Sequence, residues 1–173
     1  TLINVIGGKI TTYRKLAEEV LALVDRRTQN RSKKWTAGTA LPGGDFAVLS
    51  FDALVIEAQR HFAFADPLLV RRLARLYGTE VWTLLKDCQQ ICDLGTHFGA
   101  GLYQVEVDYL VREEWARLAQ DIVYRRTKLG LRMTVEEISA LEQYLDTLDF
   151  LDDASVDQRV ADLSPDVDSA QMA

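Results

Sequence analysis

The chain opens with a short apolar stretch that ends at two glycines. Residues 1–6 (TLINVI) are apolar and largely β-branched, and Gly7 and Gly8 follow at once. Such a stretch predicts a buried β-strand. Because a lone strand leaves its edge groups unpaired, we expect it either to pair with a segment that the pattern does not reveal or to come from a larger sheet.

The pattern changes to helical spacing directly after the glycines. The run from Thr11 to Arg27 predicts a helix, with Thr11 or Thr12 as its N-cap. Residues 28–45 are polar and basic and end in a Leu-Pro-Gly-Gly-Asp run, which predicts a loop and a domain junction. Apolar residues recur on one side of the predicted helix, at Leu16, Val20, Leu23 and Val24.

Beyond the junction the apolar positions keep a helical period. Asp45, Thr79 and Thr134 are predicted N-caps, Pro67 suits a first turn, and Gly78 closes that helix. Glycines at positions 95, 99 and 101 predict a loop, and we find no convincing strand after residue 30. The fold class is therefore all-α, a compact domain of about five to six helices preceded by the strand–Gly-Gly–helix segment. The predicted helices cover residues 46–60, 67–77, 79–91, 104–126 and 134–148.

The longest predicted helix, residues 104–126, has two distinct sides. One side carries acids four residues before bases, a spacing that adds a few tenths of a kcal/mol per exposed pair. We interpret it as a solvated face over a core stripe. The charged pairs are Asp108–Arg112, Glu113–Arg117 and Asp121–Arg125, and the apolar stripe is Val107, Val111, Trp115, Leu118 and Ile122.

Composition narrows the class of protein. With 48% hydrophobic and 27% charged residues the chain has ordinary globular composition. Its two cysteines fit a reducing compartment rather than a disulfide scaffold. No apolar run reaches the roughly 18 residues of a membrane span, and the first residues show no signal-peptide pattern. We therefore expect a cytoplasmic protein without a transmembrane segment.

The chain divides into three predicted parts: residues 1–34, the helical domain 35–150 and an acidic tail, 151–173. Charge is unevenly distributed between the two ends of the chain. Residues 1–34 carry eight basic and three acidic side chains, whereas the last 38 residues, 136–173, carry one basic and eleven acidic. An acidic tail and a net charge of −6 give no support to nucleic-acid binding.

The glycine turn is the feature most able to bind a ligand. Glycines let a backbone approach a ligand closely, and the following helix presents N–H groups with partial positive charge. Lys9 adds a full charge at the same place. A phosphate, a carboxylate or a reduced flavin ring would be attracted there. The alternative is an ordinary tight turn between two elements.

Three stretches together carry a family resemblance. GGKITTYRKLAE begins at Gly7; WTAG and LPGGDF lie within residues 35–46; and the third runs from Leu102 through VREEWA to RRTKLG, which ends at Gly130. They resemble, in that order, the last flavin-contacting turn, the junction into the C-terminal domain and that domain's signature helix in FAD-dependent (aerobic, quinone-linked) glycerol-3-phosphate dehydrogenase. The chain is thus similar to the C-terminal region of that family, with residues 1–34 as a remnant of its flavin-binding domain.

The resemblance implies a function for the complete enzyme. The family oxidises sn-glycerol 3-phosphate to dihydroxyacetone phosphate and passes the electrons through FAD to membrane quinone. By resemblance, Gly8, Lys9, Ile10 and Thr11 contact FAD, mostly through backbone groups; the alternative is that Lys9 points to solvent. We expect the chain to pack on the rest of its flavin-binding domain, within an enzyme peripheral on the cytoplasmic face of the inner membrane, with homo-oligomer contacts as a further role.

The isolated chain lacks other parts that the family's chemistry needs. The dinucleotide-binding GxGxxG motif does not occur in this sequence, and the family's substrate-handling residues fall mainly outside it. We therefore assign no catalytic residue here and expect the isolated chain to be inactive and to bind no flavin.

The other candidate residues favour structural roles. Cys88, Cys92 and His97 give three soft ligands where a zinc site normally needs four, so we predict reduced thiols and no metal. His61 is predicted to be a cap or surface residue. The cluster Arg125–Lys128 suits a helix C-terminus, with contact to phospholipid, the flavin domain or a second subunit as alternatives.

A rival hypothesis is a free-standing helical interaction module with no catalytic role. The coding region upstream separates the two. The enzyme hypothesis expects a strand–GxGxxG–helix pattern about 300–350 residues earlier.

Overall fold

The computed structural model describes residues 2–29, 33–47 and 49–148. It confirms the all-α class: among these residues the only sheet is a two-stranded hairpin. No described helix combines the length and apolar character needed to cross a bilayer. The α-helices are α1 (Tyr13–Thr28), α2 (Phe51–His61), α3 (Pro67–Tyr77), α4 (Val81–Leu84), α5 (Gln104–Glu114) and α6 (Val135–Asp146), and the hairpin joins β1 (His97–Gly99) to β2 (Leu102–Tyr103).

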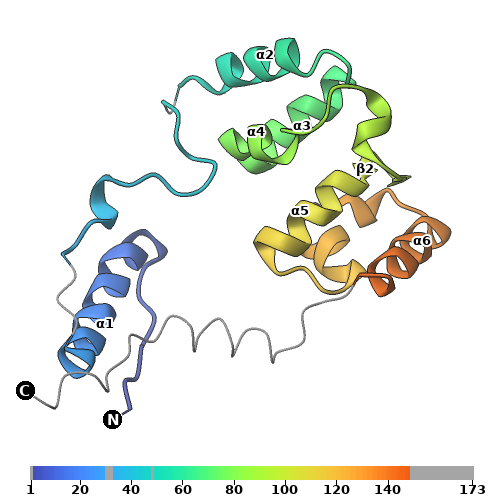
Figure 1. Ribbon diagram of the computed structural model, residues 1–173. Coiled ribbons are helices and arrows are strands. Elements are labelled where there is room, and N and C mark those ends of the chain that lie inside the picture. The colour runs from blue at the N-terminus through green and yellow to red at the C-terminus, as the bar shows by residue number, and fades with distance from the viewer. Residues whose placement is uncertain (1, 30–32, 48, 149–173) are drawn as a thin grey trace, which may run out of the picture.

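Helix α1 stands apart from the other helices (Figure 1). It confirms the predicted helix, but none of its residues is buried. Leu16 and Val20 are half-buried, and Leu23 and Val24 are exposed. The apolar side of α1 is therefore left largely uncovered by the described residues.

The strand predicted for residues 1–6 is wrong within the described part, residues 2–6. These residues have no regular structure, and Ile6 is 87% exposed. A strand forms only when a neighbouring strand satisfies its edge hydrogen bonds. Among the described residues the only strands are β1 and β2, which pair with each other and not with residues 2–6.

The hydrophobic core lies entirely in the helical domain between Leu54 and Leu145. Figure 1 shows α2, α3 and α4 as one group and α5, α6 and residues 121–126 as another, with α5 in contact with α4. The two groups share one continuous apolar cluster. Its largest fully buried apolar side chains are Leu73, Leu85, Leu94, Leu102, Leu110, Ile122 and Leu141.

Two helices begin where the sequence predicted. Pro67 opens α3, and the Asp66 carboxylate accepts a hydrogen bond from the Leu68 N–H at 2.7 Å. Thr134 and Glu137 form a capping box at the start of α6, in which each side chain accepts from the other's backbone N–H. Both signals are contained in one turn of chain, so they act independently of distant contacts.

The helix predicted after Asp45 starts later, at Phe51, so the Asp45 cap is wrong. The preceding residues instead cross the end of α3, where the Gly43 carbonyl accepts the Thr79 N–H at 3.0 Å. Gly43 and Gly78 both have positive φ, and a Cβ on either would overlap the other segment's backbone. We call residues 41–44 the strap.

The helix predicted for residues 79–91 is much shorter than expected. A 3₁₀ turn over Gly78–Glu80 leads into α4, which ends at Leu84. The Asp93 carboxylate then accepts the backbone N–H groups of Gln89 and Gln90, at 2.8 and 3.0 Å. This side chain offers the backbone an alternative to the helix, and a second 3₁₀ turn follows over Ile91–Leu94.

The predicted helix 104–126 is interrupted. Helix α5 ends at Glu114, Trp115 adopts a left-handed conformation, and a single π-helical turn covers Asp121–Arg126. Trp115 and Leu118, expected in the apolar stripe, are 80% and 59% exposed. The reason is that both residues lie in the interruption, where the helical period no longer decides which side faces the core.

The structure keeps one of the ion pairs predicted along residues 104–126 and gives Asp108 and Arg112 other partners. Asp121–Arg125 forms, whereas Asp108 accepts a hydrogen bond from the Tyr144 hydroxyl at 2.6 Å. Arg112 pairs with its neighbour Glu113 at 2.7 Å.

The glycine loop contains the hairpin, so the expectation of no strand after residue 30 is also wrong. Gly99, Ala100 and Gly101 all have positive φ and turn the chain between β1 and β2. Strands this short carry no readable alternation of apolar and polar residues.

Candidate functional site

The predicted flavin-contacting residues form one exposed turn. Gly8, Lys9, Ile10 and Thr11 are all exposed, and Lys9 is in extended conformation. The Lys9 carbonyl accepts both the N–H and the hydroxyl of Thr12, at 2.9 and 2.8 Å. A 3₁₀ turn over Ile10–Thr12 then runs directly into α1.

The N–H groups at this turn are not capped by the flanking side chains. Thr12 occupies the N-cap position of α1, but its hydroxyl donates to a carbonyl instead of accepting from an N–H, and Lys9 gives no side-chain cap to the 3₁₀ turn. The first N–H groups of a helix have no partner within it. The turn therefore presents backbone donors next to a cation, which is the chemistry of an anion site.

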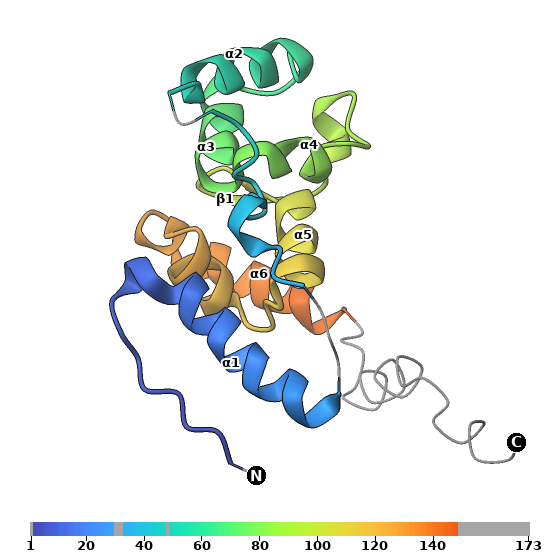
Figure 2. The ribbon, with the colours of Figure 1, turned by 90° about the vertical axis from the view of Figure 1, so that its left-hand side faces the viewer.

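Four apolar residues lie within or close to the turn in the sequence. Val5, Ile6, Ile10 and Tyr13 are all more than half exposed. Large exposed apolar patches mark interaction surfaces. Figure 2, with residues 2–9 beside α1, shows this end of the chain projecting from the helical domain.

Residues of the predicted junction contact α1 at Glu18. Its carboxylate accepts the Thr36 hydroxyl at 2.5 Å and pairs with Arg14 at 2.8 Å and with Lys34 at 3.9 Å. The hydrogen bond from Thr36, with smaller contributions from the two cations, holds the pKa of Glu18 below its usual range. Sequence reasoning assigned no role to this contact, since Glu18 and Thr36 lie far apart along the chain.

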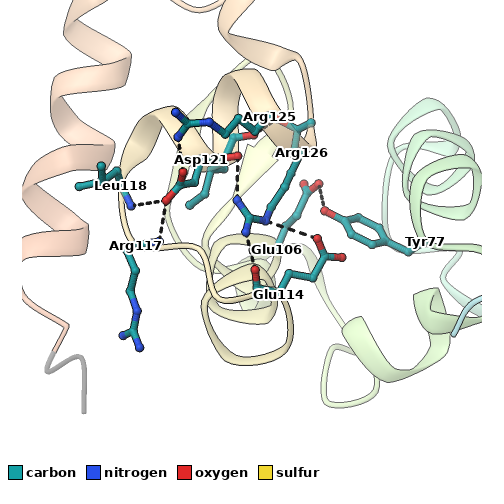
Figure 3. A network of polar contacts seen from close by, with 10 residues as sticks. Tyr77, Glu106, Glu114, Arg117, Leu118, Asp121, Arg125 and Arg126 are labelled. Carbon is teal, nitrogen blue, oxygen red and sulfur yellow. Dashed lines mark hydrogen bonds and ion pairs between the residues drawn. The ribbon is translucent and has the colours of Figure 1, made fainter. Parts of the chain in front are cut away.

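A second polar cluster is buried inside the helical domain. Glu106 is 1% exposed, and its carboxylate binds Arg72 through two hydrogen bonds of 2.8 and 2.6 Å and accepts the Tyr77 hydroxyl at 2.8 Å. Arg72 also donates to the Gly101 carbonyl at 2.7 Å. Figure 3 shows the contact between Tyr77 and Glu106. The cluster joins α3, the β-turn and α5.

The electrostatics of this cluster keep both partners of Glu106 protonated. Burial, supported by the Glu106 charge and hydrogen bond, strongly raises the pKa of Tyr77. Burial opposes the charge on Arg72, but the hydrogen bond and charge of Glu106 outweigh it, so the pKa of Arg72 is raised. Sequence reasoning missed Glu106; the available signal was an acid at helical spacing with the apolar residues Tyr109 and Leu110.

The cluster Arg125–Lys128 serves the local fold. Arg126 donates to the carbonyls of Glu114 and Asp121 and pairs with the Glu114 carboxylate at 3.5 Å (Figure 3). Arg125 pairs with Asp121, and Lys128 donates to the Tyr124 carbonyl.

The remaining candidates are the two cysteines and His61. Cys88, which is buried, and Cys92, which is exposed, are free thiols, and burial raises the pKa of Cys88. Among the residues that the structure describes, no three His, Cys, Asp or Glu side chains form a metal-binding group. His61 ends α2, edge-on to Trp82 at 5.1 Å between ring centroids. The acidic tail, 151–173, lies outside the described residues.

Comparison with known proteins defines the class. The family described as the C-terminal domain of alpha-glycerophosphate oxidase matches residues 34–150, which is most of the chain. The chain therefore belongs to this family of C-terminal domains.

Individual relatives narrow the class further. The chain is 46% identical over 144 residues to a glycerol-3-phosphate dehydrogenase of Pseudomonas aeruginosa and 38% identical over 144 residues to the aerobic glycerol-3-phosphate dehydrogenase of Escherichia coli; each match covers 83% of the chain. It is 37% identical over 145 residues, 84% of the chain, to a D-erythritol 1-phosphate dehydrogenase of Brucella abortus. These matches span only 28%, 28% and 29% of the respective relatives.

Proposed function

We propose that this chain is the C-terminal part of a flavoprotein that oxidises sn-glycerol 3-phosphate to dihydroxyacetone phosphate and passes the electrons through FAD to quinone. The 46% identity to a glycerol-3-phosphate dehydrogenase carries the proposal. In this proposal residues 1–34 belong to the flavin-binding domain, and residues 35–150 form the helical domain that packs on it. The enzyme is peripheral on the cytoplasmic face of the inner membrane.

The exposed turn fits the role of a flavin contact. FAD, when bound, supplies the redox chemistry by taking up two electrons from the substrate. The uncapped N–H groups at Ile10 and Thr11 and the Lys9 ammonium would hold the ring and would stabilise negative charge placed beside them. Gly8 has no Cβ, so its backbone would be able to approach the ring closely.

The substrate class is a polyol phosphate. One relative is named for D-erythritol 1-phosphate and two for glycerol 3-phosphate, and the highest of the three identities is to a glycerol-3-phosphate dehydrogenase. We therefore assign glycerol 3-phosphate as the substrate. Assaying the complete protein with both compounds tests this choice: faster quinone reduction with D-erythritol 1-phosphate would reverse the assignment.

We expect the purified 173-residue chain to be colourless and to show no FAD binding by calorimetry. One turn and one helix do not replace a dinucleotide-binding fold. The complete protein, expressed with the residues that precede Thr1, should be yellow and should reduce a quinone analogue when glycerol 3-phosphate is added. A complete protein without flavin or activity would favour the rival hypothesis of a helical interaction module.

A second prediction concerns Lys9→Met in the complete protein. The substitution keeps much of the bulk and removes the charge that favours reduced flavin. A lysine charge covered by the bound ring would favour the reduced flavin by about 1–2 kcal/mol, and 30 mV corresponds to about 1.4 kcal/mol for two electrons. The flavin potential should therefore fall by some tens of millivolts, and reduction by substrate should slow.

Spectroelectrochemical titration of wild type and Lys9→Met measures this shift. Lys15→Met, which removes a charge from an exposed position two turns further on, is the matched control and should leave the potential unchanged. Equal potentials and equal reduction rates for wild type and Lys9→Met would assign Lys9 to solvent.

A further inference from the structure

The loop after α5, residues 115–118, contains Trp115, which has an exposed side chain and an unfavourable backbone conformation. Trp115 has φ +53° and is 80% exposed, and Leu118 beside it is 59% exposed. A left-handed backbone is unfavourable for a bulky residue. An exposed tryptophan gains little from burial that would offset this cost. We call residues 115–118 the Trp115 loop.

Backbone and side-chain hydrogen bonds hold the Trp115 loop in one conformation. The Ala116 N–H donates to the Leu110 carbonyl at 3.1 Å, and Ala116 is completely buried. The Asp121 carboxylate accepts the N–H groups of Arg117 and Leu118, at 3.1 and 3.0 Å (Figure 3). These two hydrogen bonds, with a smaller contribution from Arg125, keep the pKa of Asp121 below its usual range.

Arg126 anchors the base of the same loop. It spans the interruption by binding the Glu114 carbonyl and carboxylate on one side and the Asp121 carbonyl, at 3.2 Å, on the other (Figure 3). A loop held in one conformation loses little freedom on association. The Trp115 loop therefore presents its apolar side chains as a preorganised surface.

The loop lies on the side of the molecule that carries other uncovered apolar surface. Figures 1 and 2 place α1 on the side of the helical domain where α5 ends. The apolar side of α1 is itself largely uncovered. The chain spans only 28% of its dehydrogenase relatives, so most of such a protein lies outside it.

We propose that the Trp115 loop is a docking surface of the helical domain for the flavin-binding part of the same polypeptide, which precedes residue 1. This inference rests on the proposed function, because it requires that part to exist. A tryptophan with a neighbouring arginine is typical of the residues that anchor an interface. A lipid surface fits less well: residues 112–121 carry two bases and three acids, which gives no excess charge for anionic headgroups.

Trp115→Asn tests the docking, because asparagine tolerates a left-handed backbone better than tryptophan does. The 173-residue chain should therefore keep its thermal midpoint or gain slightly. The complete protein should lose about 5 °C in midpoint and release its flavin about tenfold faster as the domain contact loosens. Leu131→Asn is the matched control, since Leu131 is equally exposed at 80% but lies on a different turn; it should change neither value.

Each other outcome overturns the proposal. An equal loss in both proteins would place Trp115 in the domain's own fold. An unchanged complete protein that no longer sediments with phosphatidylglycerol-containing vesicles would identify lipid as the partner. An unchanged complete protein with normal sedimentation would leave the loop without a docking role. Failure of the proposed function is distinct: the wild-type complete protein would then contain no flavin at all.

Discussion

Arg72→Ala should lower the free energy of unfolding of this chain by about 3–5 kcal/mol. The substitution removes both hydrogen bonds that Arg72 gives to Glu106 and leaves a carboxylate, 1% exposed, without its countercharge. The Gly101 carbonyl also loses its arginine donor. A domain typically has about 5–15 kcal/mol of stability, so this single change removes much of it.

Urea unfolding followed by circular dichroism measures the loss. Arg71→Ala is the matched control on the same helix, because Arg71 is half-exposed and lies 3.9 Å from Asp52 at the surface. Such a pair contributes about 0–1 kcal/mol. Equal losses of stability for the two alanine variants would show that the buried cluster contributes no more to stability than a surface ion pair.

A triple variant separates the buried charge from the packing. Arg72→Met, Glu106→Leu and Tyr77→Phe together replace the cluster by apolar groups and leave no hydroxyl without an acceptor. Because buried ion pairs exchange for apolar residues at little cost, we expect this variant to regain most of the stability that Arg72→Ala loses.

Gly78→Ala should cost about 2–3 kcal/mol, through two effects. The added Cβ overlaps the Gly43 carbonyl oxygen and displaces the strap, and alanine disfavours the positive φ of 57°. Displacing the strap also lengthens the hydrogen bond from Thr79 to Gly43. Limited proteolysis should then cut at residues 39–45 before the helical domain unfolds.

Gly101→Ala isolates the conformational part of that cost. Gly101 also has positive φ, at 80°, but its Cβ position has no atom within 4 Å. It should cost only about 1 kcal/mol, and cleavage at the strap should not increase. If urea unfolding gave the same loss of stability for Gly78→Ala and Gly101→Ala, the close contact between the strap and the end of α3 would make no separate contribution to stability.

The predicted elements that the structure confirms have signals within one or two turns of chain. Asp66 with Pro67 starts α3, and Thr134 with Glu137 starts α6. The exposed turn at Gly8–Thr11 likewise needs only adjacent residues to bring its backbone donors together. Its assignment to flavin remains a prediction, which came from resemblance and not from geometry.

Other features depend on partners that periodicity does not reveal. The stripe through Trp115 and Leu118 predicted a continuous helix, but Asp121 and Arg126 stabilise an interruption there. Asp45 is a good cap residue, but the strap before it first crosses α3 at Gly78. Glu106 is one of four acids on α5, and only the approach of Arg72 and Tyr77 makes its burial possible.

The amino-acid sequence by itself determined the all-α class, the starts of α3 and α6 and the family. These follow from helical period, local caps and runs of adjacent residues. The tertiary structure alone decided where α5 ends, which acid is buried and which apolar sides stay uncovered. The physical reason is that a pattern reports which side of a helix is apolar, whereas coverage of that side depends on segments that are distant along the chain.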